Sequence, residues 1–72
     1  MNYDFDITRQ ELEAFIDSWI LNDRDAEIIR LRLLHGKTYD QIAEIVDMSP
    51  RQIARIIPKQ INHLIKHGLK VM

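Results

Sequence analysis

The 72 residues suit one small domain, and the absence of cysteine excludes both a disulfide framework and a thiolate zinc site. No apolar run approaches the roughly 18 residues of a membrane span and the N-terminus is acidic, so we expect a cytoplasmic protein without a membrane span or secretory signal. The formal net charge of −1 does not by itself indicate a nucleic-acid partner.

The first predicted helix covers residues 8–21 and follows an N-terminal arm, residues 1–7, that we expect to lay Phe5 on the helices. Thr8 can cap this helix, because its hydroxyl can accept a backbone N–H while Glu11 reaches back to complete a capping box. Apolar side chains then recur at helical spacing and predict one buried face. The face comprises Leu12, Phe15, Ile16, Trp19 and Ile20.

The second predicted helix covers residues 22–36. Asn22 can cap its start, and Gly36 can supply the left-handed residue that ends it. Its apolar residues cover more than half of the circumference, so the helix is either central in the fold or in contact with another subunit. They are Ala26, Ile28, Ile29, Leu31, Leu33 and Leu34.

A third predicted helix, residues 38–47, and a fourth, residues 49–67, are joined by a tight corner at Asp47 and Met48. Their apolar positions fall where two crossed helices must meet, and the small side chain of Ala43 allows a close approach. These positions are Ile42, Val46, Met48, Ile53 and Ile56. The pattern is typical of a helix-turn-helix, whose second helix lies in the DNA major groove.

Both of these helices begin with capping signals. Thr38 can cap the third helix with Gln41 three residues on, and Ser49 can cap the fourth with Gln52. Pro50 reinforces the second start, because proline favours the first helical position. Two caps in register with the apolar positions make the helix-turn-helix prediction fairly specific.

Pro58 lies within the predicted fourth helix. It cannot donate to the carbonyl of Ala54 and its ring clashes with that turn, a cost of about 3 kcal/mol. The helix is therefore expected either to kink there or to stop, in which case a fifth helix begins at Pro58. The predicted fold class is all-α: a single domain, residues 1–72, built as a bundle of four helices, or five.

Charge is distributed unevenly along the chain. Residues 1–47 hold all 11 acidic residues, whereas residues 48–72 hold five of the ten basic residues and no acidic one. The C-terminal third can therefore attract a polyanion that the rest of the chain repels. Alternatively, the two halves neutralise each other within a folded domain or a dimer.

Two pieces of the chain, DRDAEIIRLRLLHGKTYDQIAEIV and SPRQIARI, carry a family resemblance. Residues 22–67, which contain them, resemble region 4 of bacterial sigma factors, a promoter-reading domain, and related helix-turn-helix regulators. The resemblance implies that the first piece holds the scaffold helix. It also implies that the second piece is the recognition helix, which in this family reads the −35 promoter element.

The chain departs from the family pattern at three points. Asp47 stands where the family usually has glycine, although aspartate tolerates left-handed geometry better than most residues. Pro58 lies where family members have an unbroken helix. No segment resembles region 2, which in the family binds core polymerase and melts the −10 element. We therefore expect a small sigma-like regulator of a phage or mobile element rather than a stand-alone sigma factor.

The predicted base-reading residues lie in the first turns of the fourth helix. Arg51, Gln52 and Arg55 project away from its apolar face. Arginine can bond a guanine edge, and glutamine can both donate to and accept from adenine. Ser49 and Pro50 lie at the entrance to the groove.

Phosphate contacts, which position a domain without reading sequence, are predicted for Lys37, Thr38 and Lys59. Two alternatives stay open for the base readers. The arginines can instead form a solvated helix face or pair with nearby acids, and Gln52 can be consumed by its capping box. The acids within reach are Asp40, Glu44 and Asp47.

His63 and His67 have the spacing of two zinc ligands on one helical face. Because there is no cysteine and no third ligand nearby in the sequence, lone surface histidines explain them better. We predict neither a metal nor a cofactor. No serine–histidine–acid set and no glycine-rich phosphate loop is present, so the chain is not expected to be an enzyme.

The sequence predicts a sequence-specific regulator of transcription whose partner is double-stranded DNA. One helix-turn-helix of this size buries little DNA surface, so we expect a homodimer through apolar helix faces: the second helix, Ile57 and Ile65. A protein-interaction module that docks on RNA polymerase or a sigma factor is the alternative. A phage DNA-packaging or recombination accessory protein is a further one.

Overall fold

The computed structural model describes residues 7–70. Four helices make up the fold: α1 (Arg9–Trp19), α2 (Asp23–Leu33), α3 (Tyr39–Val46) and α4 (Pro50–Lys66). Within the described residues there is no strand, and the predicted all-α fold class is confirmed. Most of the predicted N-terminal arm lies outside this range, but its last residue, Ile7, packs against the core.

The four helices begin at the predicted N-caps. In each case the cap side chain accepts a hydrogen bond from the backbone N–H of the residue three positions later, which satisfies one of the helix's unpaired donors. Three of the starts are complete capping boxes. The N-caps are Thr8, Asn22, Thr38 and Ser49, and Asn22 is the one without a capping box.

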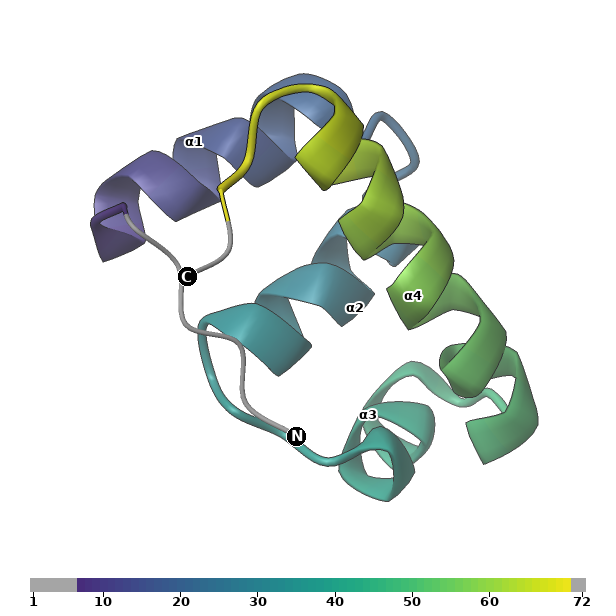
Figure 1. The fold of residues 1–72 in the computed structure, drawn as a ribbon. Coiled ribbons are helices and arrows are strands. Elements are labelled where there is room, and N and C mark those ends of the chain that lie inside the picture. Colours follow the sequence, from purple (N-terminus) through teal and green to yellow (C-terminus); the bar gives the residue numbers. More distant parts are fainter. Residues whose placement is uncertain (1–6, 71–72) are drawn as a thin grey trace.

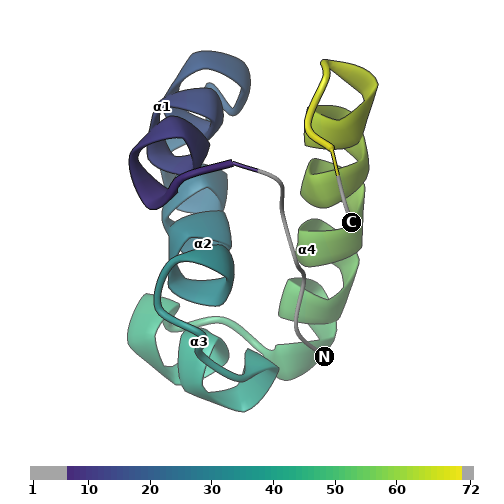
Figure 2. The same ribbon diagram turned by 60° about the vertical axis from the view of Figure 1, so that its left-hand side comes forward.

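The longest helix, α4, packs against each of the other three. Figure 1 shows α4 descending from the end of α1 to the corner beside α3. In Figure 2, α1, α2 and α3 are stacked in one column, and α4 runs alongside all three. Its two ends therefore have different neighbours: α3 beside its start and α1 beside its end.

The core is apolar and α2 lies at its centre. Four of the six apolar residues predicted for this helix are buried within the single chain: Ala26, Ile28, Ile29 and Leu31. Of the two alternatives for α2, the central position is therefore the correct one. Ile57 is 0% exposed, so the prediction that α2 and Ile57 supply a dimer interface is wrong. Of the other predicted interface positions, Ile65 is 42% exposed, and Leu33 and Leu34 at the end of the second helix are half-buried, so a dimer stays a prediction.

The predicted buried face of α1 is confirmed except at Trp19. Leu12, Ile16 and Ile20 are buried and Phe15 is half-buried, but Trp19 is 40% exposed. Its indole stacks on the ring of His67, with centroids 4.0 Å apart and planes 8° apart. The apolar periodicity of α1 places Trp19 on the correct face, but at the end of the helix the indole packs on an imidazole and stays partly exposed.

Pro58 neither stops α4 nor starts a fifth helix, so that alternative is wrong. The side chains of Ile53, Ile57, Ile61 and Leu64, on both sides of the proline, are buried. Each such side chain contributes about 1.5–3 kcal/mol on burial, so together they outweigh the roughly 3 kcal/mol cost of an interior proline. Packing against the other helices holds α4 together.

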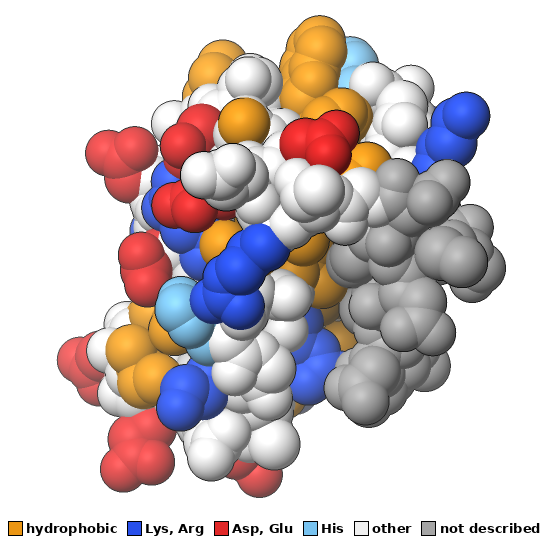
Figure 3. Space-filling model, turned by 90° about the vertical axis from the view of Figure 1, so that its left-hand side faces the viewer, with side chains coloured by type: hydrophobic (Ala, Val, Ile, Leu, Met, Phe, Trp, Pro, Cys, Tyr) orange, Lys and Arg blue, Asp and Glu red, His pale blue; other side chains and the backbone are white. Residues whose placement is uncertain are grey.

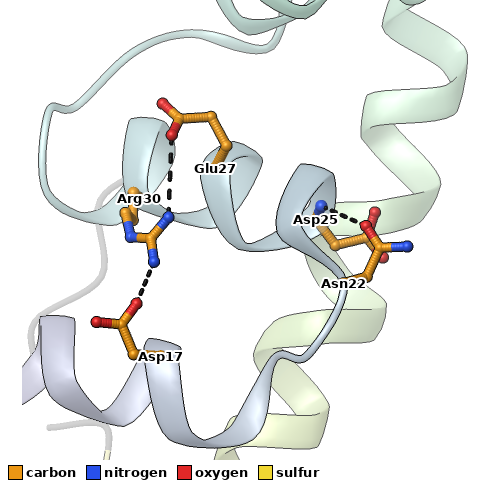
Figure 4. A network of polar contacts seen from close by, with 5 residues as sticks. All are labelled: Asp17, Asn22, Asp25, Glu27 and Arg30. Carbon is orange, nitrogen blue, oxygen red and sulfur yellow. Dashed lines mark hydrogen bonds and ion pairs between the residues drawn. The ribbon is translucent and has the colours of Figure 1, made fainter.

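Polar contacts tie α1 to α2 at the surface. Arg30 of α2 donates through Nη2 to the carboxylate of Asp17 on α1, and its Nη1 lies 3.9 Å from Oε2 of Glu27 (Figure 4). These pairs are partly exposed, so they orient the two helices more than they stabilise them. None of the helices in the described part of the chain is long and apolar enough to cross a membrane.

Candidate nucleic-acid interface

The corner between α3 and α4 turns at Asp47, which has φ 56° and ψ 50° and so adopts the left-handed conformation. The N–H groups of Asp47 and Met48 both donate to the carbonyl of Ala43, which ends α3. Ser49 then caps α4. Asp47 therefore adopts the left-handed conformation at the position where sigma region 4 usually has glycine. This agrees with the expectation that aspartate tolerates that conformation.

The apolar positions predicted for the crossing of α3 and α4 are confirmed. Ile42 and Ile53 are fully buried, and Ala43 is buried at 4% exposure, as the close approach of the helices requires. Val46, Met48 and Ile56 are half-buried and pack against the core. The inner face of α4 is thereby fixed on α3, which decides which of its side chains face outward.

Arg51 and Arg55 are exposed on the outward face of α4. Among residues 7–70, the ion pairs are Arg24 with Asp25 and Arg30 with both Asp17 and Glu27. The alternative in which Arg51 and Arg55 pair with Asp40, Glu44 or Asp47 is therefore not observed in this range. Their guanidinium groups remain available to an external acceptor.

The outward face continues as a polar stripe along the whole of α4. Its members recur at spacings of three and four and are all exposed: Arg51, Arg55, Lys59, Asn62 and Lys66. The predicted site included Lys59 but neither Asn62 nor Lys66. The helical spacing could have found both. In contrast, acidic side chains gather along the left margin of the opposite face (Figure 3).

The start of α4 holds Ser49, Pro50 and Gln52 together at one end of this stripe. Oε1 of Gln52 accepts hydrogen bonds from the backbone N–H of Ser49 (3.0 Å) and from its hydroxyl (3.2 Å). The hydroxyl oxygen of Ser49 in turn accepts from the backbone N–H of Gln52 at 3.3 Å. The capping box therefore engages Gln52, as one of the alternatives predicted, but it uses only the side-chain oxygen.

Lys37 and Thr38, the predicted phosphate contacts, lie together before α3. Thr38 Oγ1 accepts from the backbone N–H of Gln41 at 3.1 Å, which leaves the threonine at the exposed N-terminal end of the helix. Nη1 of Arg32 donates to the carbonyl of Lys37 (2.9 Å), and its guanidinium lies 5.0 Å from the centre of the Tyr39 ring. Arg32 thus positions this turn, a role that no local sequence pattern predicts.

A scan against protein-family models matches residues 20–64 to sigma-70, region 4. The chain belongs to the sigma-70 region 4 family. The match runs from the end of α1 almost to the end of α4 and so includes the whole helix-turn-helix. A search of curated proteins and a search of solved structures found no match. The family supports a helix-turn-helix domain of the DNA-binding kind.

A second surface of this region 4 domain lies at the other end of α4. A hollow of about 600 Å³ opens between the second half of α4 and the α1–α2 connection, and among residues 7–70 no acidic side chain lines it. Lys59 and Lys66 lie on its α4 side, while Trp19 and Leu21 lie across from them. Leu21 is 86% exposed, the most exposed large apolar side chain in the described residues.

His63 and His67 have packing partners on α1. Nε2 of His63 lies 3.0 Å from the carbonyl oxygen of Trp19, and the His63 ring meets the edge of the His67 ring at 4.6 Å. His67 is exposed, as predicted, but both histidines have partners, so the prediction that they are lone side chains is wrong. Within residues 7–70, no three histidine, cysteine, aspartate or glutamate side chains cluster as metal ligands.

Proposed function

We propose that this region 4 domain is a sequence-specific regulator of transcription that binds double-stranded DNA with the start of α4 in the major groove. The observation that carries the proposal is the exposed basic stripe on α4, whose inner face is fixed against α3. Arg51 and Arg55 can each donate two hydrogen bonds to a guanine edge, at about 1–3 kcal/mol of discrimination per good pair.

Phosphate contacts complete the proposed interface. Lys37 and Thr38 lie at the start of α3, and Lys59 lies one turn beyond Arg55 along the stripe. Such contacts fix the register of a domain on the duplex without reading its sequence. The proposed role is binding without catalysis or cofactor, in the cytoplasm, where promoter DNA is available.

The two arginines give the proposal its first test. Fluorescence anisotropy of a labelled random-sequence duplex would be measured across a salt series for the wild type and for Arg51→Ala/Arg55→Ala. The wild type is expected to bind with an affinity that falls steeply with salt, since binding releases counterions from phosphates. On a random-sequence duplex the two arginines meet mostly non-cognate bases and contact phosphates instead, so the double variant should reduce the slope of log K against log salt by about 1–2, at about 0.9 for each lost phosphate contact.

The matched control is Arg9→Ala/Arg24→Ala, which removes the same charge from exposed positions outside α3 and α4. It should leave the slope near that of the wild type. An equal fall in slope for both double variants would show that net charge alone governs binding. In that case the proposed placement of α4 in the groove is wrong.

Docking on RNA polymerase or a sigma factor is a second candidate function, supported by the hollow beside Leu21. From Arg51 to Lys66, α4 rises about 22 Å, so the hollow, which begins at Lys59, lies toward the opposite end of the helix from the proposed base readers. Its exposed leucine and its lysines suit an apolar protein surface with acidic neighbours. Salt-dependent binding to polymerase with none to any duplex at about 50 mM salt would favour this function over the first.

A further inference from the structure

The side-chain oxygen of Gln52 has no remaining capacity to accept a hydrogen bond. A carbonyl oxygen offers two lone pairs. In this domain Oε1 accepts from the backbone N–H of Ser49 at 3.0 Å and from the Ser49 hydroxyl at 3.2 Å. Both bonds fix the amide against the first turn of α4, so the oxygen faces the helix and the amide NH2 group on the same carbon faces away from it.

We propose that Gln52 is a specificity-determining residue that presents only hydrogen-bond donors to DNA, and that it selects guanine and rejects cytosine at the base it faces. The inference rests on the proposed function, because it requires the start of α4 to lie in the major groove. Gln52 is exposed at that start, beside Arg51.

The four bases differ in what they offer such a donor. Guanine presents two acceptors in the major groove, N7 and O6, and no donor. The usual adenine contact of glutamine needs the amide oxygen to accept from N6, and here that oxygen is already occupied. Cytosine presents a donor, N4, which opposes the donor of Gln52. Thymine presents one acceptor, O4. Guanine, with two acceptors and no donor, is therefore the preferred base, and cytosine is the least favourable.

The capping box also makes the contact selective at low entropic cost. A free glutamine side chain can rotate its amide to suit either guanine or adenine, and it loses rotamer freedom when it binds. In this domain the two bonds to Ser49 fix the orientation before DNA arrives. We expect a preference of about fivefold or more for guanine over cytosine, the low end for a base contact.

The test compares the sites that wild type and Gln52→Glu select from a random duplex library. Glutamate keeps the capping box, because one carboxylate oxygen can accept from Ser49, but it replaces the NH2 group with an acceptor. The variant should fold like the wild type in thermal unfolding and prefer cytosine where the wild type prefers guanine, since a carboxylate accepts from N4. Anisotropy on duplexes that differ at that one position measures the reversal as a ratio of affinities.

Gln41→Glu is the matched control. Gln41 occupies the same third position of α3, and its Oε1 accepts from the backbone N–H of Thr38 at 2.9 Å. The substitution adds the same negative charge in a capping box outside the start of α4. It should lower affinity for all duplexes alike and leave every base preference unchanged.

Three outcomes separate this inference from the function on which it rests. Reversal from guanine to cytosine in Gln52→Glu alone supports it. The inference is overturned, and DNA binding is left intact, if wild type and Gln52→Glu select the same bases at every position. It is also overturned if the wild type prefers adenine at the position where the two differ. If the wild type selects no site, the inference falls together with the proposed function.

Discussion

Asp47 carries the backbone strain of the helix-turn-helix, since its φ of 56° is the only positive one outside glycine in the described residues. A β-branched side chain tolerates this region far less well than aspartate. Asp47→Val is therefore expected to lower the free energy of unfolding by about 1–2 kcal/mol. Asp47→Gly should stay within about 1 kcal/mol of the wild type, because relief of strain offsets the entropy of glycine. Thermal unfolding followed by circular dichroism measures both.

Glu44→Val provides the control for this comparison, because Glu44 is exposed in the regular part of α3. Its cost is limited to helix propensity, about half a kcal/mol. If Asp47→Val and Glu44→Val lowered the free energy of unfolding equally, the proposed backbone strain at Asp47 would be contradicted.

Residues whose partners lie within one helical turn were predictable from sequence, and those with distant partners were not. Thr38 and Ser49 were identified as caps because their bonds close on residues three positions away. In contrast, Nε2 of Gln60 donates to Oδ2 of Asp25 at 2.8 Å across 35 residues. This bond and the stack of Trp19 on His67 depend on how α4 packs, which no local pattern encodes.

At the scale of the helix, Pro58 leaves a measurable defect in α4. The carbonyl of Ala54 lacks the helical donor that position 58 would otherwise supply. Pro58→Ala is therefore expected to raise the free energy of unfolding by about 1–3 kcal/mol. For a domain of this size that corresponds to a midpoint higher by at least about 4 °C. Thermal or urea unfolding would measure the gain.

Pro50→Ala is the matched control, because Pro50 occupies the first position of the same helix. Proline is favourable there, so its removal should give no gain. A similar increase from both substitutions would point to a general effect of proline on the unfolded chain and would contradict the proposed defect.

The positions of the helices followed from their caps, whereas the continuity of α4 did not. Local rules predict a kink or a break at Pro58, since they consider only the carbonyl and the ring. The outcome depends on Ile57 and Ile61, which are buried on either side of the proline by contacts with other helices. Tertiary packing therefore excludes the break, whereas the kink stays a prediction.

At the scale of the molecule, the homodimer predicted from the sequence would use the flank of α4 at Ile65, the most exposed of the predicted interface positions. Light scattering at micromolar concentration should give twice the chain mass of 8.6 kDa. Ile65→Lys should shift the mass toward the monomer, because it places a desolvated charge in the interface. Ile45→Lys, at a 55% exposed position on α3, should not. A monomer mass for the wild type would contradict the dimer.

The separation of charge gives the domain a preferred approach to a polyanion. Every acidic residue lies before position 48, whereas the outward stripe of α4 is basic. Such a field steers association and weakens as salt rises. In the proposed mode of binding, this field orients the domain as a whole, and not Arg51 and Arg55 alone, so that α4 meets the duplex first.

The chain's only tryptophan, Trp19, lies where α1 meets the end of α4, far along α4 from the corner at Asp47. Its indole is half open to solvent and stacked on an imidazole, so its emission depends on whether that stack is closed. The domain therefore contains an optical reporter of one end of α4. A change at the start of α4, the end proposed to bind DNA, is local if it leaves the tryptophan emission unchanged. A change there that alters the emission has been transmitted along the whole helix.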